Sequence, residues 1–196
     1  MRVAFVGLGV MGYPMAGFLA DAGHEITVYN RTKEKAEAWQ KFYGGTIADT
    51  PAGAAVCADI IFCCVGDDPD VRAVILGDDG ILEGLSEGSV VVDHTTASAK
   101  VAHEVYQAAK EKDVGFLDAP LSGGQAGAES GQLSIMVGGD GDVYERVLPI
   151  MQCYAKVCTH IGPVGSGQLA KMANQICIAG LVQGLSEALH FVKCVD

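Results

Sequence analysis

The chain has 196 residues, of which 49% are hydrophobic, and its mean hydropathy is +0.27, so we expect a globular protein rather than a disordered one. Its formal net charge of -11 argues against nucleic acid and against an acidic membrane surface as partners. The 7 cysteines and 5 histidines have neither disulfide-framework nor zinc spacing, and no signal peptide or uninterrupted spanning segment is evident. We therefore expect no metal, no membrane and a reducing cytoplasm.

The beginning of the chain carries the strongest pattern. An apolar run over residues 3–6 predicts a buried strand, and G-x-G-x-x-G follows it at once. Residues 11–20 have apolar side chains at helical spacing, Gly23 is expected just after the helix, and residues 25–29 predict a second strand. Strand, glycine loop, helix and strand together predict a βαβ unit of the dinucleotide-binding kind.

The three motif glycines have separate tasks in such a unit. Gly7 allows the tight turn, Gly9 lets the backbone approach a pyrophosphate, and Gly12 lets the helix pack close to the sheet. The helix N-terminus adds free N–H groups and a partial positive charge. The competing interpretation is a turn that the glycines merely shape. We predict cofactor contacts from Gly7, Leu8, Gly9, Val10, Met11 and Gly12.

The end of the second predicted strand selects between the two dinucleotides. An NAD site usually has Asp or Glu there, whereas this chain has Asn30-Arg31-Thr32. Neutral Asn30 does not repel a 2′-phosphate, and Arg31 can bind that phosphate and stack on adenine. Thr32 can cap the next helix and offer its hydroxyl. The pattern predicts NADP(H), with NAD(H) as the alternative; the competing interpretation is a polar turn with Arg31 in solvent.

The middle of the chain alternates strands with helices. Helices are predicted over residues 32–43, 50–56, 67–76, 98–112 and 140–152, and strands over 59–65, 89–93, 114–118, 133–137 and 155–161. This alternation predicts an α/β fold with a doubly wound parallel sheet, in which residues 1–163 form one dinucleotide-binding domain.

The last segment has a different pattern. After a glycine-rich loop, residues 168–195 read as one helix that is apolar on nearly every face for most of its length. Such a helix normally lies inside a bundle. We therefore predict that residues 164–196 form a long interdomain helix, the first element of a truncated helical domain. We also predict that the protein forms homo-oligomers through this helix and the missing helical domain.

Ligands of open α/β sheets bind beyond the carboxyl ends of the strands, and two predicted site stretches lie there. Val65 and Thr96 end two neighbouring strands and are expected to contact the cofactor, although Thr96 could instead cap a helix. We leave His94 out of the site as a structural residue. Ser122, Gly123 and Gly124 offer N–H groups and a hydroxyl that suit a carboxylate, the alternative being a plain glycine turn.

The third stretch is the start of the long helix. Lys171 lies one turn before Asn174 and Gln175. A lysine on an apolar helix is costly to bury, and desolvation beside a nicotinium charge would lower its pKa towards the range of general acid/base groups. The alternative is a lysine that extends its amine to solvent.

Taken together, these motifs resemble the β-hydroxyacid dehydrogenase family: 3-hydroxyisobutyrate dehydrogenase, tartronate semialdehyde reductase, and glyoxylate and succinic semialdehyde reductases. The matching stretches are residues 7–16, 30–32, 118–139 and 162–174. The resemblance implies that Lys171 is catalytic, that Ser122, Gly123 and Gly124 hold the substrate, and that Thr96 contacts the cofactor. The family's asparagine four residues after the lysine is replaced by Gln175, which leaves open whether Asn174 or Gln175 contacts substrate. Members also continue into an all-helical domain.

The sequence is thus interpreted as part of an NADP(H)-preferring oxidoreductase that interconverts a small 3-hydroxyacid and its semialdehyde. Its expected partners are a carboxylate-bearing substrate and further copies of itself. Two alternatives are kept: an imine reductase of similar architecture, although those enzymes usually lack the lysine, and a dinucleotide-binding module without catalysis.

Overall fold

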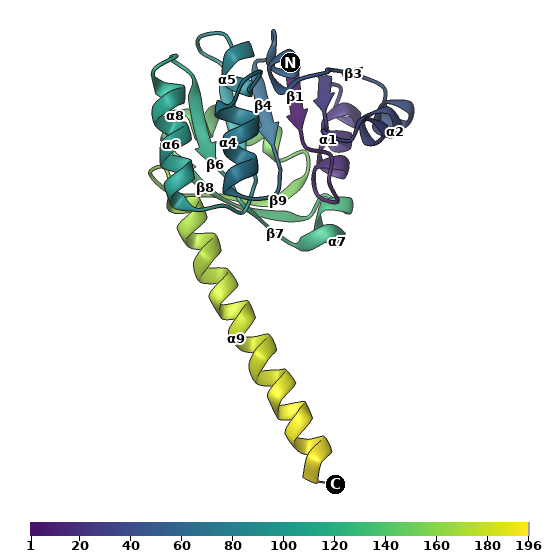
Figure 1. The fold of residues 1–196 in the computed structure, drawn as a ribbon, viewed down its shortest axis with the longest axis vertical. Helices are drawn as coiled ribbons and strands as arrows, with labels where there is room; N and C mark the ends of the chain where they lie inside the picture. The colour runs from purple at the N-terminus through teal and green to yellow at the C-terminus, as the bar shows by residue number, and fades with distance from the viewer. Residues whose placement is uncertain (196) are drawn as a thin grey trace.

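One sheet organises residues 1–195, the part of the chain that the computed structural model describes (Figure 1). Its strands are β1 (Arg2–Val6), β2 (Glu25–Tyr29), β3 (Thr46–Ile47), β4 (Ile60–Cys63), β5 (Val90–Asp93), β6 (Gly115–Asp118), β7 (Leu121–Ser122), β8 (Leu133–Gly139) and β9 (Ala155–Gly162). The helices are α1 (Gly12–Asp21), α2 (Lys33–Tyr43), α3 (Pro51–Ala55), α4 (Asp68–Leu76), α5 (Ile81–Gly84), α6 (Ala99–Lys110), α7 (Gly124–Glu129), α8 (Gly141–Met151) and α9 (Ser166–Val195).

The strand order is β3-β2-β1-β4-β5-β6-β8-β7, with β9 also paired to β8. All pairs from β3 to β6 are parallel, and the chain reverses its direction of winding between β1 and β4. This is a Rossmann-like doubly wound sheet, as the alternation of strands and helices predicted. The ligand crevice of such a sheet lies at the reversal, where the glycine loop follows β1.

The expectation that the whole sheet is parallel is wrong for its second half. Strand β8 runs antiparallel to both β6 and β7, and β9, which pairs parallel to β8, shares its reversed direction. The connection from β7 to β8 contains only the six-residue helix α7. A crossover between parallel strands needs a dozen or more residues, so this short connection returns the chain antiparallel.

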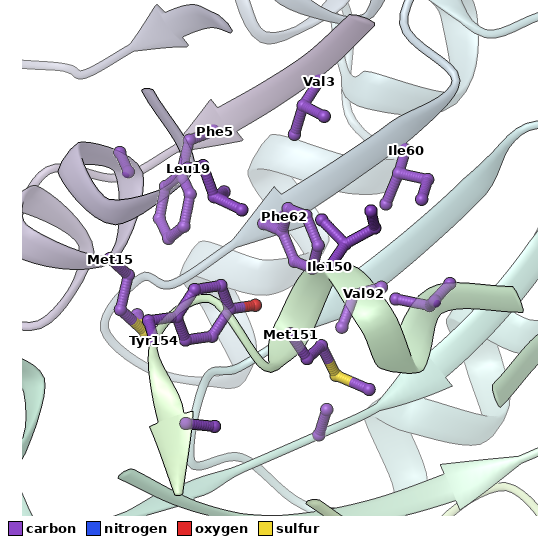
Figure 2. Close-up of a cluster of buried hydrophobic side chains, with 14 of the residues drawn as sticks. Val3, Phe5, Met15, Leu19, Ile60, Phe62, Val92, Ile150, Met151 and Tyr154 are labelled. Atoms are coloured by element: carbon purple, nitrogen blue, oxygen red, sulfur yellow. The ribbon is translucent and has the colours of Figure 1, made fainter. Parts of the chain in front are cut away.

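Both faces of the sheet are covered, which explains the continuous apolar strands. Along β1, Val3 and Phe5 join one core cluster while Ala4 and Val6 join the other. Figure 2 shows the first cluster, in which Phe5 stacks on Phe62 from the neighbouring strand and α8 covers them with Ile150 and Met151. The second cluster lies under α3 to α6. Together the two clusters make the sheet a rigid base for the loops at its edge.

Most helix boundaries agree with the sequence to within two residues. Gly23 follows α1 with φ 84°, and the Thr50 hydroxyl accepts the Gly53 N–H at the start of α3. The capping expectation for Thr32 fails in detail, because Thr32 stands at the N-cap position of α2 but its side chain forms no capping hydrogen bond. Asp140, at the N-cap position of α8, likewise forms no such bond with its side chain. The short elements β3, α5, β7 and α7 were not predicted, since segments of two to six residues have too little periodicity.

The long helix α9 projects away from the domain (Figure 1). Only Gly167, Gln168 and Lys171 are buried in it, and its later apolar side chains, such as Ile176 and Leu181, are exposed. By length and composition alone this helix could cross a membrane, which the sequence expectation did not anticipate. An apolar surface of this extent is unusual on a soluble monomer.

Candidate functional site

The glycine loop after β1 has the geometry that the motif predicted. Gly7 has φ 97°, and a side chain there would collide with the carbonyl of Cys64. A side chain on Gly12 would collide with the carbonyl of Gly7, so α1 can approach the sheet only with glycine here. Gly9 differs, because the space beside its Cα is open. An approaching ligand can therefore reach the backbone at Gly9.

The loop also leaves amide groups free. Within residues 1–195, the N–H groups of residues 9 to 12 donate no hydrogen bond, whereas Leu8 N–H donates to Asn30 Oδ1 at 2.8 Å. Free amides at a helix start suit phosphate oxygens, so the loop fits a dinucleotide pyrophosphate. A pocket of about 640 Å³ opens beside it and is lined by Gly9, Val10 and Tyr13, among others.

Of the three residues after β2, Asn30 bonds to the glycine loop, whereas Arg31 and Thr32 face solvent. The Asn30 side chain accepts from Leu8 and donates to Thr32 O at 2.9 Å, so it holds the glycine loop in place, a role that the sequence did not reveal. Arg31 and Thr32 are exposed and face outward from the same turn. The Arg31 side chain is 87% exposed, and its Nη1 pairs with Asp70 Oδ1 at 3.4 Å. Arg31 therefore lies at the surface with a carboxylate partner.

Two buried polar residues that the sequence did not single out tie α9 to the domain. Asp118, at the end of β6, accepts hydrogen bonds from Gly165 N–H at 2.7 Å and Gln168 N–H at 2.9 Å. The Gln168 side chain accepts from Ala97 N–H at 3.0 Å and donates to Thr95 O at 2.7 Å. Their only sequence signals were an acid at a strand end and an amide in the first turn of an apolar helix.

These bonds fix the backbone on either side of Thr96. Its neighbours Thr95 and Ala97 are both held by Gln168, while the Thr96 side chain remains exposed. The Thr95 hydroxyl in turn accepts the Val65 N–H at 3.0 Å. The two predicted cofactor-contacting loops, after β4 and after β5, are thereby joined to each other and to α9.

Lys171 lies one turn beyond Gln168 on the same helix. It is 8% exposed, and it forms no hydrogen bond or ion pair with any residue from 1 to 195. Burial lowers the pKa of its amine. Asn174, one turn further along, is half-buried, whereas Gln175 is exposed. Asn174 is thus the amide that lies nearer the domain surface, and either one remains a predicted substrate contact.

The predicted carboxylate loop begins at the end of β7. Ser122 is half-buried, and Gly123 and Gly124 have φ values of 127° and 58°, which favour glycine. Both glycines are exposed, so their N–H groups lie at the surface beside the Ser122 hydroxyl. Two residues connect β6 to β7, and Asp118 at the end of β6 also holds α9. The carboxylate loop thus lies one short strand, β7, beyond the residue that holds the lysine helix.

Asp93, the last residue of β5, and His94, which follows it, are both buried. His94 contacts Ala119 O at 2.7 Å and the Tyr154 hydroxyl at 2.8 Å, and burial lowers its pKa to about 4, so it stays neutral. Burial raises the pKa of Asp93 to about 7. Residues 1–195 contain no group of three or more His, Cys, Asp or Glu side chains placed to hold a metal ion.

Comparison with known proteins decides the family. Residues 2–162 match the NAD binding domain of 6-phosphogluconate dehydrogenase. The chain belongs to this family. An uncharacterised oxidoreductase of Shewanella frigidimarina is 56% identical over 98% of the chain, and the 2-hydroxy-3-oxopropionate reductase of Escherichia coli is 39% identical over 98%. The chain covers 66% and 65% of those two proteins, so it corresponds to their N-terminal part.

Solved structures agree with this assignment. A 3-hydroxyisobutyrate dehydrogenase of Mycobacterium tuberculosis, solved with L-serine, superposes with a TM-score of 0.90 at 30% identity and covers 96% of this chain, which in turn covers 64% of that chain. An imine reductase of Myxococcus stipitatus superposes with a TM-score of 0.86 at 24% identity, over 96% of this chain and 65% of its own. That second likeness concerns the fold alone. The similar proteins thus include oxidoreductases of the 3-hydroxyisobutyrate dehydrogenase type, and the chain spans just under two thirds of their length.

Proposed function

We propose that this NAD-binding domain belongs to an NADP(H)-preferring oxidoreductase that interconverts a small 3-hydroxyacid and its semialdehyde. The observation that carries the proposal is Lys171, a buried lysine without an acidic partner in residues 1–195, held one turn beyond a helix end that is tied to both cofactor loops. A lysine whose pKa is lowered by burial suits general acid/base work. The 2-hydroxy-3-oxopropionate reductase among the relatives supports the substrate class.

In the proposed mechanism, the nicotinamide, when bound, accepts or supplies the hydride. Lys171 Nζ accepts the proton of the substrate hydroxyl during oxidation and returns a proton to the aldehyde oxygen during reduction. The N–H groups of Gly123 and Gly124 and the Ser122 hydroxyl hold the substrate carboxylate. Thr96, whose flanking peptides are fixed by Gln168, orients the nicotinamide end of the cofactor.

The preference for NADP(H) rests on the outward-facing turn after β2. Arg31 and the hydroxyl of Thr32, which caps no helix, can both bind a 2′-phosphate. Position 30 carries a neutral asparagine rather than the acid that would repel such a phosphate. NADPH should bind at least about tenfold more tightly than NADH, and Arg31→Ala should remove most of that difference. Equal affinities for the two cofactors in calorimetry would refute this part of the proposal.

Two other functions remain as alternatives. An imine reductase shares the fold, but Lys171 supplies an acid/base group that such enzymes usually lack. A dinucleotide-binding module without catalysis would bind NADPH and show no turnover.

We further propose a cytoplasmic homo-oligomer that associates through the exposed side chains of α9.

The test is a panel of small semialdehydes and 3-hydroxyacids, assayed with both cofactors on a form that carries the helical C-terminal domain. We expect turnover with at least one carboxylate-bearing member and none with matched substrates in which the carboxylate is replaced by an amide. Reduction of cyclic imines without reduction of any semialdehyde would favour the imine reductase. Cofactor binding with no turnover on either panel would favour the non-catalytic module.

A further inference from the structure

Arg31 and Asp70 lie on opposite sides of the glycine loop. Arg31 follows β2, Asp70 is in the first turn of α4 after β4, and β1 with its glycine loop runs between those two strands. The Arg31 Nη1 and Asp70 Oδ1 atoms are 3.4 Å apart. Their ion pair therefore crosses the crevice at the end of the loop where the adenosine half of a dinucleotide binds.

Asp70 is the better fixed partner of the pair. Its side chain is 37% exposed, compared with 87% for Arg31. Its backbone N–H donates to Asp67 Oδ1 at 3.2 Å, which places it in the capped first turn of α4. Its carboxylate also covers the Cα of Gly66, because a side chain built on Gly66 would collide with it. The carboxylate thus has a defined position, and the arginine reaches across to it.

We propose that Asp70 is a specificity-determining residue that reduces the preference for NADPH over NADH. Its carboxylate holds the same guanidinium that a 2′-phosphate would bind, and it adds a negative charge next to that dianion. A bound 2′-phosphate must therefore displace Asp70 from Arg31 or share the arginine with it. NADH has no phosphate at this position, so its binding is much less affected. This inference rests on the proposed use of Arg31 at the 2′-phosphate.

The effect should be moderate, because the pair is exposed and screened by solvent. For one surface carboxylate facing a dianion we expect that Asp70→Asn raises the affinity for NADPH about three- to tenfold. The affinity for NADH should change by less than about twofold. The asparagine keeps the size of the side chain, so the position beside Gly66 remains filled.

Asp59→Asn provides a matched control. Asp59 pairs with Arg2 at 3.1 Å, and its side chain is 38% exposed, close to the value for Asp70. Asp59 precedes strand β4 and Asp70 follows it, so the two acids lie at opposite ends of that strand. Asp59→Asn removes the same charge from a similar Arg–Asp pair and should leave the NADPH/NADH affinity ratio unchanged.

The experiment measures NADPH and NADH binding by calorimetry on the 196-residue chain and on Asp70→Asn, Asp59→Asn, Arg31→Ala and Arg31→Ala/Asp70→Asn. The proposal is supported if the NADPH/NADH affinity ratio rises in Asp70→Asn but not in Asp59→Asn. The rise should also be much smaller when Asp70→Asn is combined with Arg31→Ala. An unchanged ratio in Asp70→Asn overturns it. A loss of affinity for both cofactors also overturns it and would mean that Asp70 orients Arg31 for stacking on adenine.

The Arg31→Ala variant separates this inference from the proposed function. If Arg31→Ala abolishes a preference for NADPH while Asp70→Asn changes nothing, the cofactor assignment stands and the role of Asp70 fails. If the parent chain shows no preference and Arg31→Ala alters neither affinity, the cofactor assignment fails, and a gain with Asp70→Asn then reflects direct charge repulsion without Arg31. Absence of binding by every variant overturns both.

Discussion

The side chain of Gln168 offers the sharpest test of how the long helix is fixed to the domain. Gln168→Leu keeps the approximate volume but removes the bonds to Ala97 N–H and Thr95 O. Gln168 is 1% exposed, so water cannot easily replace either bond. Each buried group that loses its partner costs about 1–3 kcal/mol, which predicts a loss of about 2–6 kcal/mol for the two groups together. Whole domains are stable by only about 5–15 kcal/mol.

Urea unfolding followed by tryptophan fluorescence measures this loss directly. Trp39 is the single tryptophan, it is fully buried in α2, and it lies far along the chain from the substitution. Amide exchange at Ala97 reports the broken contact locally, and it should become faster in Gln168→Leu. Gln183→Leu is the matched control on the same helix, since the Gln183 side chain is exposed and bonds only to Glu187 among residues 1–195. We expect less than about 0.5 kcal/mol there.

Equal free energies of unfolding for the two variants would refute the reasoning. That result would mean that the hydrogen bonds of the Gln168 side chain add no more stability than bonds to water would, and that the Asp118 carboxylate alone holds α9. Protection at Ala97 distinguishes the cases, because it should survive only if another group takes over the bond. The outcome therefore assigns the attachment of α9 to one of two side chains.

Three further predictions concern the chemistry, the pH dependence and the assembly. Lys171→Ala, in a form with the helical domain, should lower turnover about 10²–10⁴-fold and leave NADPH affinity nearly unchanged; retained turnover would show a structural lysine. The folded pKa of Asp93, about 7, lies above its ordinary 3.8, so its contribution to stability falls as pH rises from about 4 to 7, by on the order of 4 kcal/mol. Asp93→Asn should lack this fall in urea unfolding at several pH values, and parallel profiles would contradict it. The 196-residue chain should self-associate through α9 and show little or no turnover; an active monomer in sedimentation and steady-state assays would overturn this.

Local patterns in the sequence predicted the first half of the fold well. The glycine spacing and Gly23 each act within a few residues, so their physical effect is fully contained in the local sequence. The reversal of β8 was missed, because the choice between parallel and antiparallel depends on the length of a connection that the sequence left unassigned. Similarly, the bond from Asn30 to Leu8 joins residues 22 positions apart.

The candidate site divides in the same way. Arg31 and the Ser122 loop could be found from residue type and strand ends, whereas Gln168 and Asp118 could not. Asp118 lies 50 positions from Gln168, and only the completed sheet brings the end of β6 next to the start of α9. A buried carboxylate usually needs such partners, so an acid in an apolar strand is a signal that a partner exists without showing which one.

Lys171 stands at the boundary between the fixed and the free parts of α9. It is the last buried residue of the helix, and nearly every residue after it is exposed. Its backbone position is set by the domain, through the first turn and the Asp118 and Gln168 bonds. Its amine remains within reach of water until another surface covers α9, and removal of that water would lower its pKa further. The domain therefore sets the position of the lysine, whereas the surface that packs on α9 sets its reactivity.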